Sequence, residues 1–372
     1  DPVVRPRLPD AKFFFDQDRK KKLADRVAGL NKVVYHNKLG TQGDRIKRVE
    51  TIARAIGAQL GGEALAQQAA QAARLAKADL LTDMVGEFPE LQGIMGRYYA
   101  LHDGLSEAIA DAIEDHYKPR FAGDSLPRGR VGLVVALADK LETLAGMFGI
   151  GQIPTGDKDP FALRRHALGV IRILVEKDLD ISLHDLVNIA FEAFHRDLIG
   201  RAHTDLSIFM VDRFAGLLRE QGHTPQEVDA VMSLNPVRLN LVPKQLTAVR
   251  AFAALPEAAS LAAANKRVGN ILKKANGAVP AVIDENLLNE PAEVALKWAL
   301  GDVSQRADIA FEAGDYTTSL KSLAALKVPV DAFFNDVMVN VEDEKLRNNR
   351  LALLAQLHAA MNGIADLSKL SS

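Results

Sequence analysis

The chain has 372 residues, of which 48% are apolar and 25% are charged. Its 46 basic and 48 acidic side chains nearly cancel. This balance excludes a polycation that coats nucleic acid non-specifically, but it allows a local basic face. The absence of cysteine excludes a disulfide scaffold, a thiolate zinc site and a cysteine nucleophile. No apolar run approaches the roughly 20 residues that a membrane span needs, so we expect no membrane partner.

Predicted helices follow one another along most of the chain. Apolar residues recur at three- and four-residue spacing in residues 44–80, 90–117, 130–148, 161–177, 183–221, 244–275, 291–313 and 342–367. No stretch shows the repeated alternation of a sheet, and β-branched residues do not cluster with aromatic ones. The sequence therefore predicts an all-α fold.

Glycine and proline mark where these helices are interrupted. Residues 149–160 form a turn-rich loop, and the pattern stops and restarts between Asn235-Pro236 and Val242-Pro243. We expect the main domain boundary there, with one domain over about 1–232 and another over 233–372. The chain starts at Asp1 with neither an initiator Met nor a signal-peptide pattern, so we expect a piece of a longer cytoplasmic protein.

Histidine and aspartate residues of the first domain form a scattered set that matches the order of ligands in HD-type phosphohydrolases. In those enzymes imidazoles and carboxylates bind a divalent metal that acidifies a water. The candidate ligands here are His36, Asp83, His116 and Asp139, with an adjacent His102-Asp103 pair. Thr82 stands where the central imidazole belongs, so we expect the fold to be retained with a degenerate centre and no metal. A metal-dependent phosphohydrolase acting on a nucleotide remains the alternative function.

A second candidate is the cationic run Arg164-Arg165-His166, which follows Asp159-Pro160. Pro near a helix start, preceded by Asp, indicates a helix N-terminus, which favours anions. The two arginines could hold a phosphate, or they could pair internally with Asp157 and Asp159. The sequence leaves both interpretations open.

Two polar helix faces of the second domain carry the residue types that contact RNA. The first comprises Asn265, Lys266, Arg267 and Asn270, and the second comprises Arg347, Asn348, Asn349 and Arg350. Helical geometry predicts that Arg347 is the most exposed of the second group, unless it pairs with Asp343 or Glu344. Arg350 lies near the apolar stripe of the same predicted helix and could instead hold the fold together. That stripe comprises Leu346, Leu353, Leu354, Leu357, Met361 and Ile364. Either face could also be an ordinary solvated surface.

Motifs of self-contained nucleotide-dependent and serine enzymes are absent. The chain has no GxSxG, no GxxxxGK[ST] phosphate loop and no dinucleotide GxGxxG after a strand. The sequence therefore indicates a binding protein or an enzyme subunit whose catalytic residues lie elsewhere.

Several longer motifs resemble the β subunit of bacterial heterotetrameric glycyl-tRNA synthetase. In the first domain they are Pro6-Arg7-Leu8, Phe88-Pro89-Glu90-Leu91-Gln92-Gly93, Ala138-Asp139-Lys140-Leu141-Glu142 and Lys158-Asp159-Pro160-Phe161-Ala162-Leu163-Arg164-Arg165. The second half resembles a DALR-type anticodon-binding domain through Ala263-Ala264-Asn265-Lys266-Arg267, Val330-Asp331 and Phe333-Phe334, and Leu346-Arg347 with Asn349-Arg350-Leu351.

The resemblance implies an HD-type helical domain over 1–182, a helical linker over 183–232 and a DALR-like anticodon-binding bundle over 233–372. It also implies that the family's α subunit attaches glycine to tRNA(Gly), using ATP and Mg, while the β subunit binds tRNA. The expected partners are tRNA(Gly), the α subunit and the N-terminal region of the β subunit. The resemblance implies no catalytic residue and no cofactor in this chain, and tRNA contacts at Arg164, Arg165 and the two polar faces of the second domain. A helical scaffold that only holds partner subunits is a third hypothesis.

Overall fold

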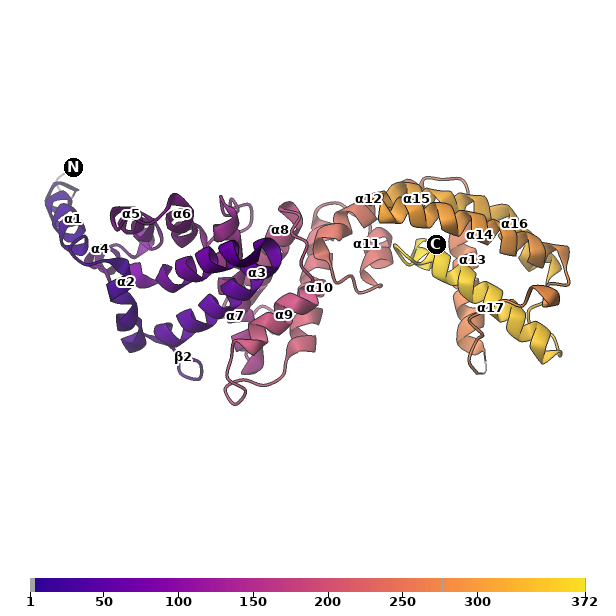
Figure 1. The fold of residues 1–372 in the computed structure, drawn as a ribbon, viewed down its shortest axis with the longest axis horizontal. Helices are drawn as coiled ribbons and strands as arrows, with labels where there is room; N and C mark the ends of the chain where they lie inside the picture. Colours follow the sequence, from indigo (N-terminus) through magenta and orange to yellow (C-terminus); the bar gives the residue numbers. More distant parts are fainter. Residues whose placement is uncertain (1–3, 276, 372) are drawn as a thin grey trace. The chain divides into compact units, whose positions relative to one another are not determined.

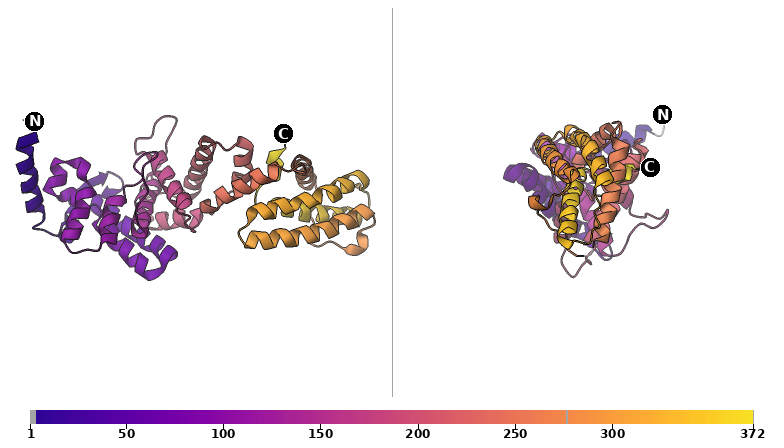
Figure 2. Two further views of the ribbon diagram at one scale, coloured as in Figure 1. Left: turned by 90° about the horizontal axis from the view of Figure 1, so that it is seen from above. Right: turned by 90° about the vertical axis from the view of Figure 1, so that its right-hand side faces the viewer.

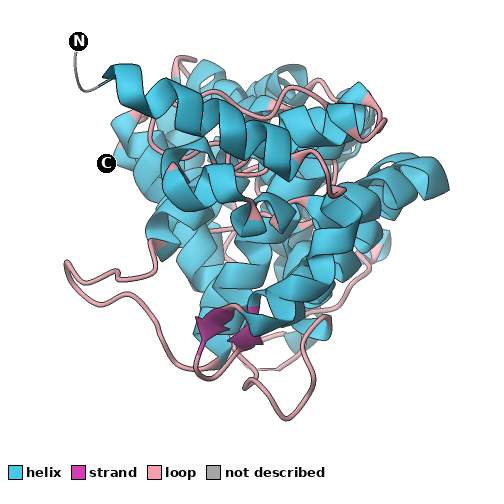
Figure 3. Cartoon of the chain, turned by 90° about the vertical axis from the view of Figure 1, so that its left-hand side faces the viewer, coloured by secondary structure: helices cyan, strands magenta, loops and turns pink. Residues whose placement is uncertain are grey.

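The computed structural model describes residues 4–275 and 277–371, with side chains from Leu8 onward, and these residues are predominantly helical. Figure 3 shows a short antiparallel hairpin of β1 (Val34–His36) and β2 (Gly40–Thr41) beside the helices, and these are the only strands in the described part of the chain. The all-α prediction is confirmed. Within the described residues no single helix is long and apolar enough to cross a membrane, although the bent pair Leu239–Ala253 and Ala258–Lys274 passes that test by length and composition.

The chain divides into two compact units, and the division falls inside helix α10 (His203–Glu220). Unit 1 comprises residues 1–214 and 237–240, and unit 2 comprises residues 215–236 and 241–372. The functional boundaries predicted at residues 182 and 232 stay a prediction, because these units are defined by packing alone.

Unit 1 is built around one helix that is buried on all sides. Every residue of α7 (Arg130–Gly149) from Val131 to Phe148 is buried. Figure 1 shows the long α3 beside α7, and α8 and α6 also pack on α7. The remaining bounds in unit 1 are α1 (Val4–Asp18), α2 (Leu23–Arg26), α3 (Gln42–Leu75), α4 (Asp83–Glu87), α5 (Ile94–His102), α6 (Glu107–Asp115), α8 (Leu163–Glu176) and α9 (Leu183–Glu192).

Unit 2 is a helical bundle whose final helix carries the predicted apolar stripe. Leu353, Leu354, Leu357 and Met361 of α17 (Glu344–Met361) are all buried. Figure 2 shows the helices of this unit running side by side, and α14 packs on both α15 and α16. The other helices are α11 (Pro225–Met232), α12 (Val242–Ala253), α13 (Ala258–Lys274), α14 (Pro291–Glu312), α15 (Tyr316–Ser322) and α16 (Lys327–Asp336).

Several predicted helices are broken where a local signal overrides the apolar period. The helix predicted over 90–117 is split into α5 and α6 by a turn at Gly104, which has a φ of +85°. The helix predicted over 44–80 ends as α3 at Leu75 and is kinked at Gly62, where φ is +73°. The segments predicted over 183–221 and 244–275 each form two helices. Helices α1, α2, α4, α11, α15 and α16 lie outside the predicted ranges.

Candidate nucleic-acid interface

The histidine and aspartate candidates of unit 1 do not gather into a metal centre. Thr82 is the N-cap of α4, because its hydroxyl accepts a hydrogen bond from the Val85 N–H and donates one to the Asp79 carbonyl. The Asp83 side chain is exposed at the start of that helix. The His36 ring packs edge-on against Phe161. Within residues 4–275 and 277–371, no three His, Asp or Glu side chains lie together as metal ligands do.

The ion-pair partners of Asp139 are an arginine and a lysine. Its carboxylate lies 3.1 Å from the Arg45 guanidinium and 3.7 Å from the Lys77 ammonium. Burial opposes ionisation of Asp139, but Arg45 and Lys77 outweigh it and hold the pKa of Asp139 well below its usual range. Burial lowers the pKa of His116 to about 3, so this ring is neutral at pH 7. Lysine and arginine therefore supply here the positive charge that a metal would supply in an HD-type hydrolase, and the hydrolase alternative has no support.

The cationic run at the start of α8 is partly used by the helix itself. The Asp159 carboxylate accepts hydrogen bonds from the backbone N–H groups of Leu163 and Arg164, at 2.8 and 3.0 Å. Asp159 therefore caps the helix through backbone groups, and among the described residues no ion pair joins Arg164 or Arg165 to Asp157 or Asp159. The Arg164 guanidinium donates to the Gly156 carbonyl, whereas Arg165 is exposed. Of the two predicted contacts, Arg165 is the one whose side chain has no partner among the described residues and can therefore bind an anion.

The two polar faces of unit 2 meet at one groove of about 890 Å³. Helix α13 contributes Arg267 and Lys274 to its wall, and the start of α17 contributes Arg347 and Asn348. The opposite wall is the end of α16 with the segment that follows it, residues 334–340. Two segments some 80 residues apart in the sequence therefore form a single surface.

Three of the predicted RNA contacts are instead buried inside unit 2. Asn265 is 1% exposed and exchanges two amide hydrogen bonds with Asn362, at 2.8 and 2.9 Å. Asn349 is 3% exposed and bonds both backbone groups of Asp284. Arg350 is 4% exposed and its Nε lies 2.7 Å from the Glu293 carboxylate. These side chains stabilise the bundle, so the prediction that they contact tRNA directly is corrected.

The other predicted residues of unit 2 remain accessible to different degrees. Lys266, Arg267 and Asn270 are exposed, but only Arg267 lines the groove. Arg347 and Asn348 are both half-buried, whereas Asn349 and Arg350 are buried, and the Arg347 guanidinium donates to the Val341 carbonyl at 2.7 Å. No ion pair joins Arg347 to Asp343 or Glu344 in the described chain. Asp343 instead caps α17, accepting from the N–H groups of Lys345 and Leu346.

The sequence analysis missed the aromatic component of the groove. The Arg267 guanidinium lies over the Phe334 ring, 4.3 Å from its centroid. Met338 is 70% exposed beside it. The Phe333-Phe334 pair was a usable signal: Phe333 is fully buried, so its neighbour on the helix had to point elsewhere.

Comparisons with known proteins assign both halves of the chain to families of tRNA synthetase domains. Residues 1–233 match the family model described as glycyl-tRNA synthetase beta subunit, and residues 261–369 match that of the DALR anticodon binding domain. The chain is 70% identical over 370 residues to the glycine–tRNA ligase beta subunit of Thiobacillus denitrificans, covering 100% of this chain and 53% of the relative. The corresponding protein of Dechloromonas aromatica is 70% identical over 371 residues, covering 100% of this chain and 52% of the relative. The chain thus spans about half the length of these curated relatives. It belongs to the glycyl-tRNA synthetase beta subunit family.

Proposed function

We propose that the groove of unit 2 binds the anticodon loop of tRNA(Gly), so that the chain serves as a tRNA-binding part of glycine–tRNA ligase. The observation that carries this proposal is the exposed Arg267 guanidinium over Phe334 at the wall of the groove. RNA-binding proteins recognise unstacked loop bases by stacking on aromatic and guanidinium planes and by hydrogen bonds to base edges. Asn348 lines the same groove and offers such hydrogen bonds.

A wider role is also part of the proposal, and the relatives' name, glycine–tRNA ligase beta subunit, supports it. Glycine attachment, with ATP and Mg as its cofactors, takes place on the α subunit in this proposal, and the chain works in the cytoplasm. The proposed partners are the α subunit, the N-terminal region of the β subunit and tRNA(Gly). We expect the isolated chain to catalyse no glycine-dependent pyrophosphate exchange, and detectable exchange would contradict this division of labour.

The anticodon assignment can be tested by changing Arg267 to Ala and measuring tRNA binding. We expect the affinity for tRNA with a glycine anticodon to fall by about 1–3 kcal/mol, as expected for a base contact. Binding to a tRNA whose second anticodon cytosine is replaced should change much less. The matched control is Lys266→Ala, since Lys266 is the adjacent exposed cation and does not line the groove.

Equal losses on both tRNAs would demote Arg267 to a phosphate contact. No loss on either, with helicity intact, would place the anticodon site elsewhere. Binding should also weaken as salt rises, with a slope near −0.7 per phosphate contact for single-stranded RNA.

A further inference from the structure

A second pocket, in unit 1, is walled by the end of α6, the loop after it, α7 and the start of α8. Its volume is about 420 Å³, within the range of small-ligand sites. The cations in its lining are Lys118, Arg120, Lys140 and Arg165. Neither the proposed tRNA groove nor the family assignment gives this pocket a role.

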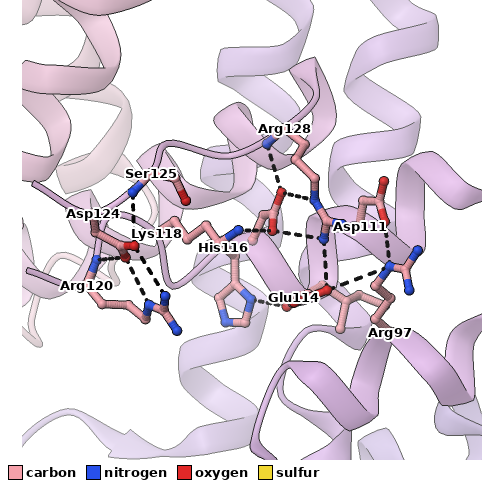
Figure 4. Close-up of polar contacts among 11 residues, drawn as sticks. Arg97, Asp111, Glu114, His116, Lys118, Arg120, Asp124, Ser125 and Arg128 are labelled. Atoms are coloured by element: carbon pink, nitrogen blue, oxygen red, sulfur yellow. Dashed lines mark hydrogen bonds and ion pairs between the residues drawn. The ribbon is translucent and has the colours of Figure 1, made fainter.

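Two of these four cations are already neutralised by carboxylates. The Lys118 ammonium lies 3.1 Å from Asp115, and Arg120 forms a two-pronged pair with Asp124 at 2.9 and 3.2 Å. Figure 4 shows Arg120 directed at Asp124 in this way. These pairs shape the wall of the pocket and leave little charge there for a ligand.

Lys140 is different, because it is buried without a counter-ion. It is 2% exposed, and no carboxylate in the described part of the chain lies within 4 Å of its ammonium. Its hydrogen-bond partner is the Tyr117 carbonyl, at 3.3 Å, which uses one of its three N–H donors. Burying an unpaired charge is unfavourable. Consistent with this, burial lowers the pKa of Lys140 to about 8.

The backbone of α8 makes room for this lysine. A Cβ atom at Gly169 would lie 2.7 Å from Cε of Lys140, so the glycine leaves room for the lysine side chain in the position that it takes here. One turn earlier on the same helix, Arg165 is exposed at the pocket and has no ion-pair partner among the described residues. A buried ammonium and an exposed guanidinium thus face one cavity from adjacent helices.

We propose that Lys140 and Arg165 bind the phosphate group of a small ligand, either inorganic phosphate or the phosphate of a mononucleotide. A phosphate oxygen accepts charge-assisted hydrogen bonds from both residue types. It would provide the counter-ion that Lys140 lacks among the described residues. The proposal concerns binding only and assigns no reaction to the pocket. It does not depend on the tRNA groove of unit 2.

The test is titration calorimetry of the full chain with inorganic phosphate and, separately, with AMP. We expect saturable one-to-one binding of at least one of them. Tighter binding of AMP would identify a mononucleotide as the source of the phosphate, and equal or weaker binding would identify inorganic phosphate. The absence of saturable binding of either probe would overturn the proposal.

Variants assign the binding to the pocket. Lys140→Met keeps an unbranched stem beside Gly169, and it should weaken binding at least about tenfold, as expected for the loss of one charge-assisted hydrogen bond. Arg165→Gln should weaken it by a smaller factor, and because Arg165 is exposed this variant tests the site even if Lys140→Met does not fold. The matched control is Lys321→Met, an exposed lysine of α15 in unit 2.

One variant should have the opposite effect. Glu90 also lines the pocket, is exposed, and pairs with no cation in the described residues. Glu90→Gln should therefore tighten phosphate binding, since it removes a negative charge facing the anion. Unchanged affinity in Arg165→Gln and Glu90→Gln, or an equal loss in Lys321→Met, would show that phosphate binds outside this pocket and would overturn the proposal.

Discussion

Arg48 in unit 1 and Arg267 in unit 2 each lie over a phenylalanine ring, 4.6 Å from the centroid of Phe194 and 4.3 Å from that of Phe334. Arg48 is also 2.9 Å from the Glu142 carboxylate and is buried. Arg267 is exposed and has no ion-pair partner in the described chain. An arginine over a phenylalanine ring therefore stabilises the core in unit 1, whereas in unit 2 the same arrangement leaves the cation available to a ligand. The two arginines differ because Arg48 is buried beside the Glu142 carboxylate and Arg267 is not.

The largest expected effect is on the stability of unit 1, through the buried ion pairs that Glu142 forms with two arginines. Glu142 is fully buried and accepts from both Arg45 and Arg48 at 2.9 Å. Glu142→Gln should lower the free energy of unfolding of unit 1 by about 3–5 kcal/mol, because it leaves the buried Arg48 without its carboxylate partner and leaves Arg45 with Asp139 alone. Urea unfolding with hydrogen exchange resolved by peptide measures this. Asp302→Asn, which breaks an exposed pair with Arg306, is the control and should change little. A similar small change in both variants would contradict the comparison.

The next largest effect is a difference in stability between variants of Arg350 and Arg347, two arginines of unit 2 that lie close in sequence. Arg350→Met should destabilise unit 2 by about 3 kcal/mol, because it leaves the fully buried Glu293 carboxylate without its cationic partner. Arg347→Met should destabilise it much less, since Arg347 is half-buried and bonds backbone carbonyls. Hydrogen exchange of α14 and α17 peptides distinguishes the two. If Arg350→Met weakened tRNA binding without loosening these helices, Arg350 would have a direct role after all.

Acid should weaken unit 1 through His116, which is buried, and His166, which is half-buried. Burial, reinforced by nearby lysines, lowers the pKa of His116 to about 3 and of His166 to about 4. Between these values and the unfolded pKa near 6.5 the unfolded chain binds more protons, so stability falls as pH drops through that range. At pH 5 each histidine should reduce the free energy of unfolding by about 2 kcal/mol relative to pH 7. His116→Leu should remove about half of this pH dependence, and an unchanged dependence would exclude His116 as its source.

The smallest expected effect concerns a cation just outside the groove. Lys266→Ala should reduce tRNA affinity slightly and equally for native and altered anticodons, because Lys266 is exposed but does not line the groove. Filter binding at two salt concentrations measures this, and the salt slope should fall by about one if Lys266 contacts a phosphate. A loss specific to the native anticodon would move the boundary of the groove to include Lys266.

The sequence by itself determined the all-α class, because helical periodicity is a local property of a chain. It located α7, α8, α14 and α17 closely, and the eight-residue run ending in Arg164-Arg165 marked the family. It also identified Thr82 as incompatible with a metal centre, since residue type alone decides whether an imidazole is present.

Only the tertiary structure decided which polar residues are available to a ligand. Arg350 and Arg267 carry the same charge on helices of similar pattern, yet one meets Glu293 and the other meets solvent above Phe334. Asn265 is buried because Asn362, distant in sequence, offers it a matching amide. In the described part of the chain Lys140 has no counter-ion, because the nearby carboxylates pair with other cations. Such pairings join residues far apart in the chain, so no local pattern encodes them.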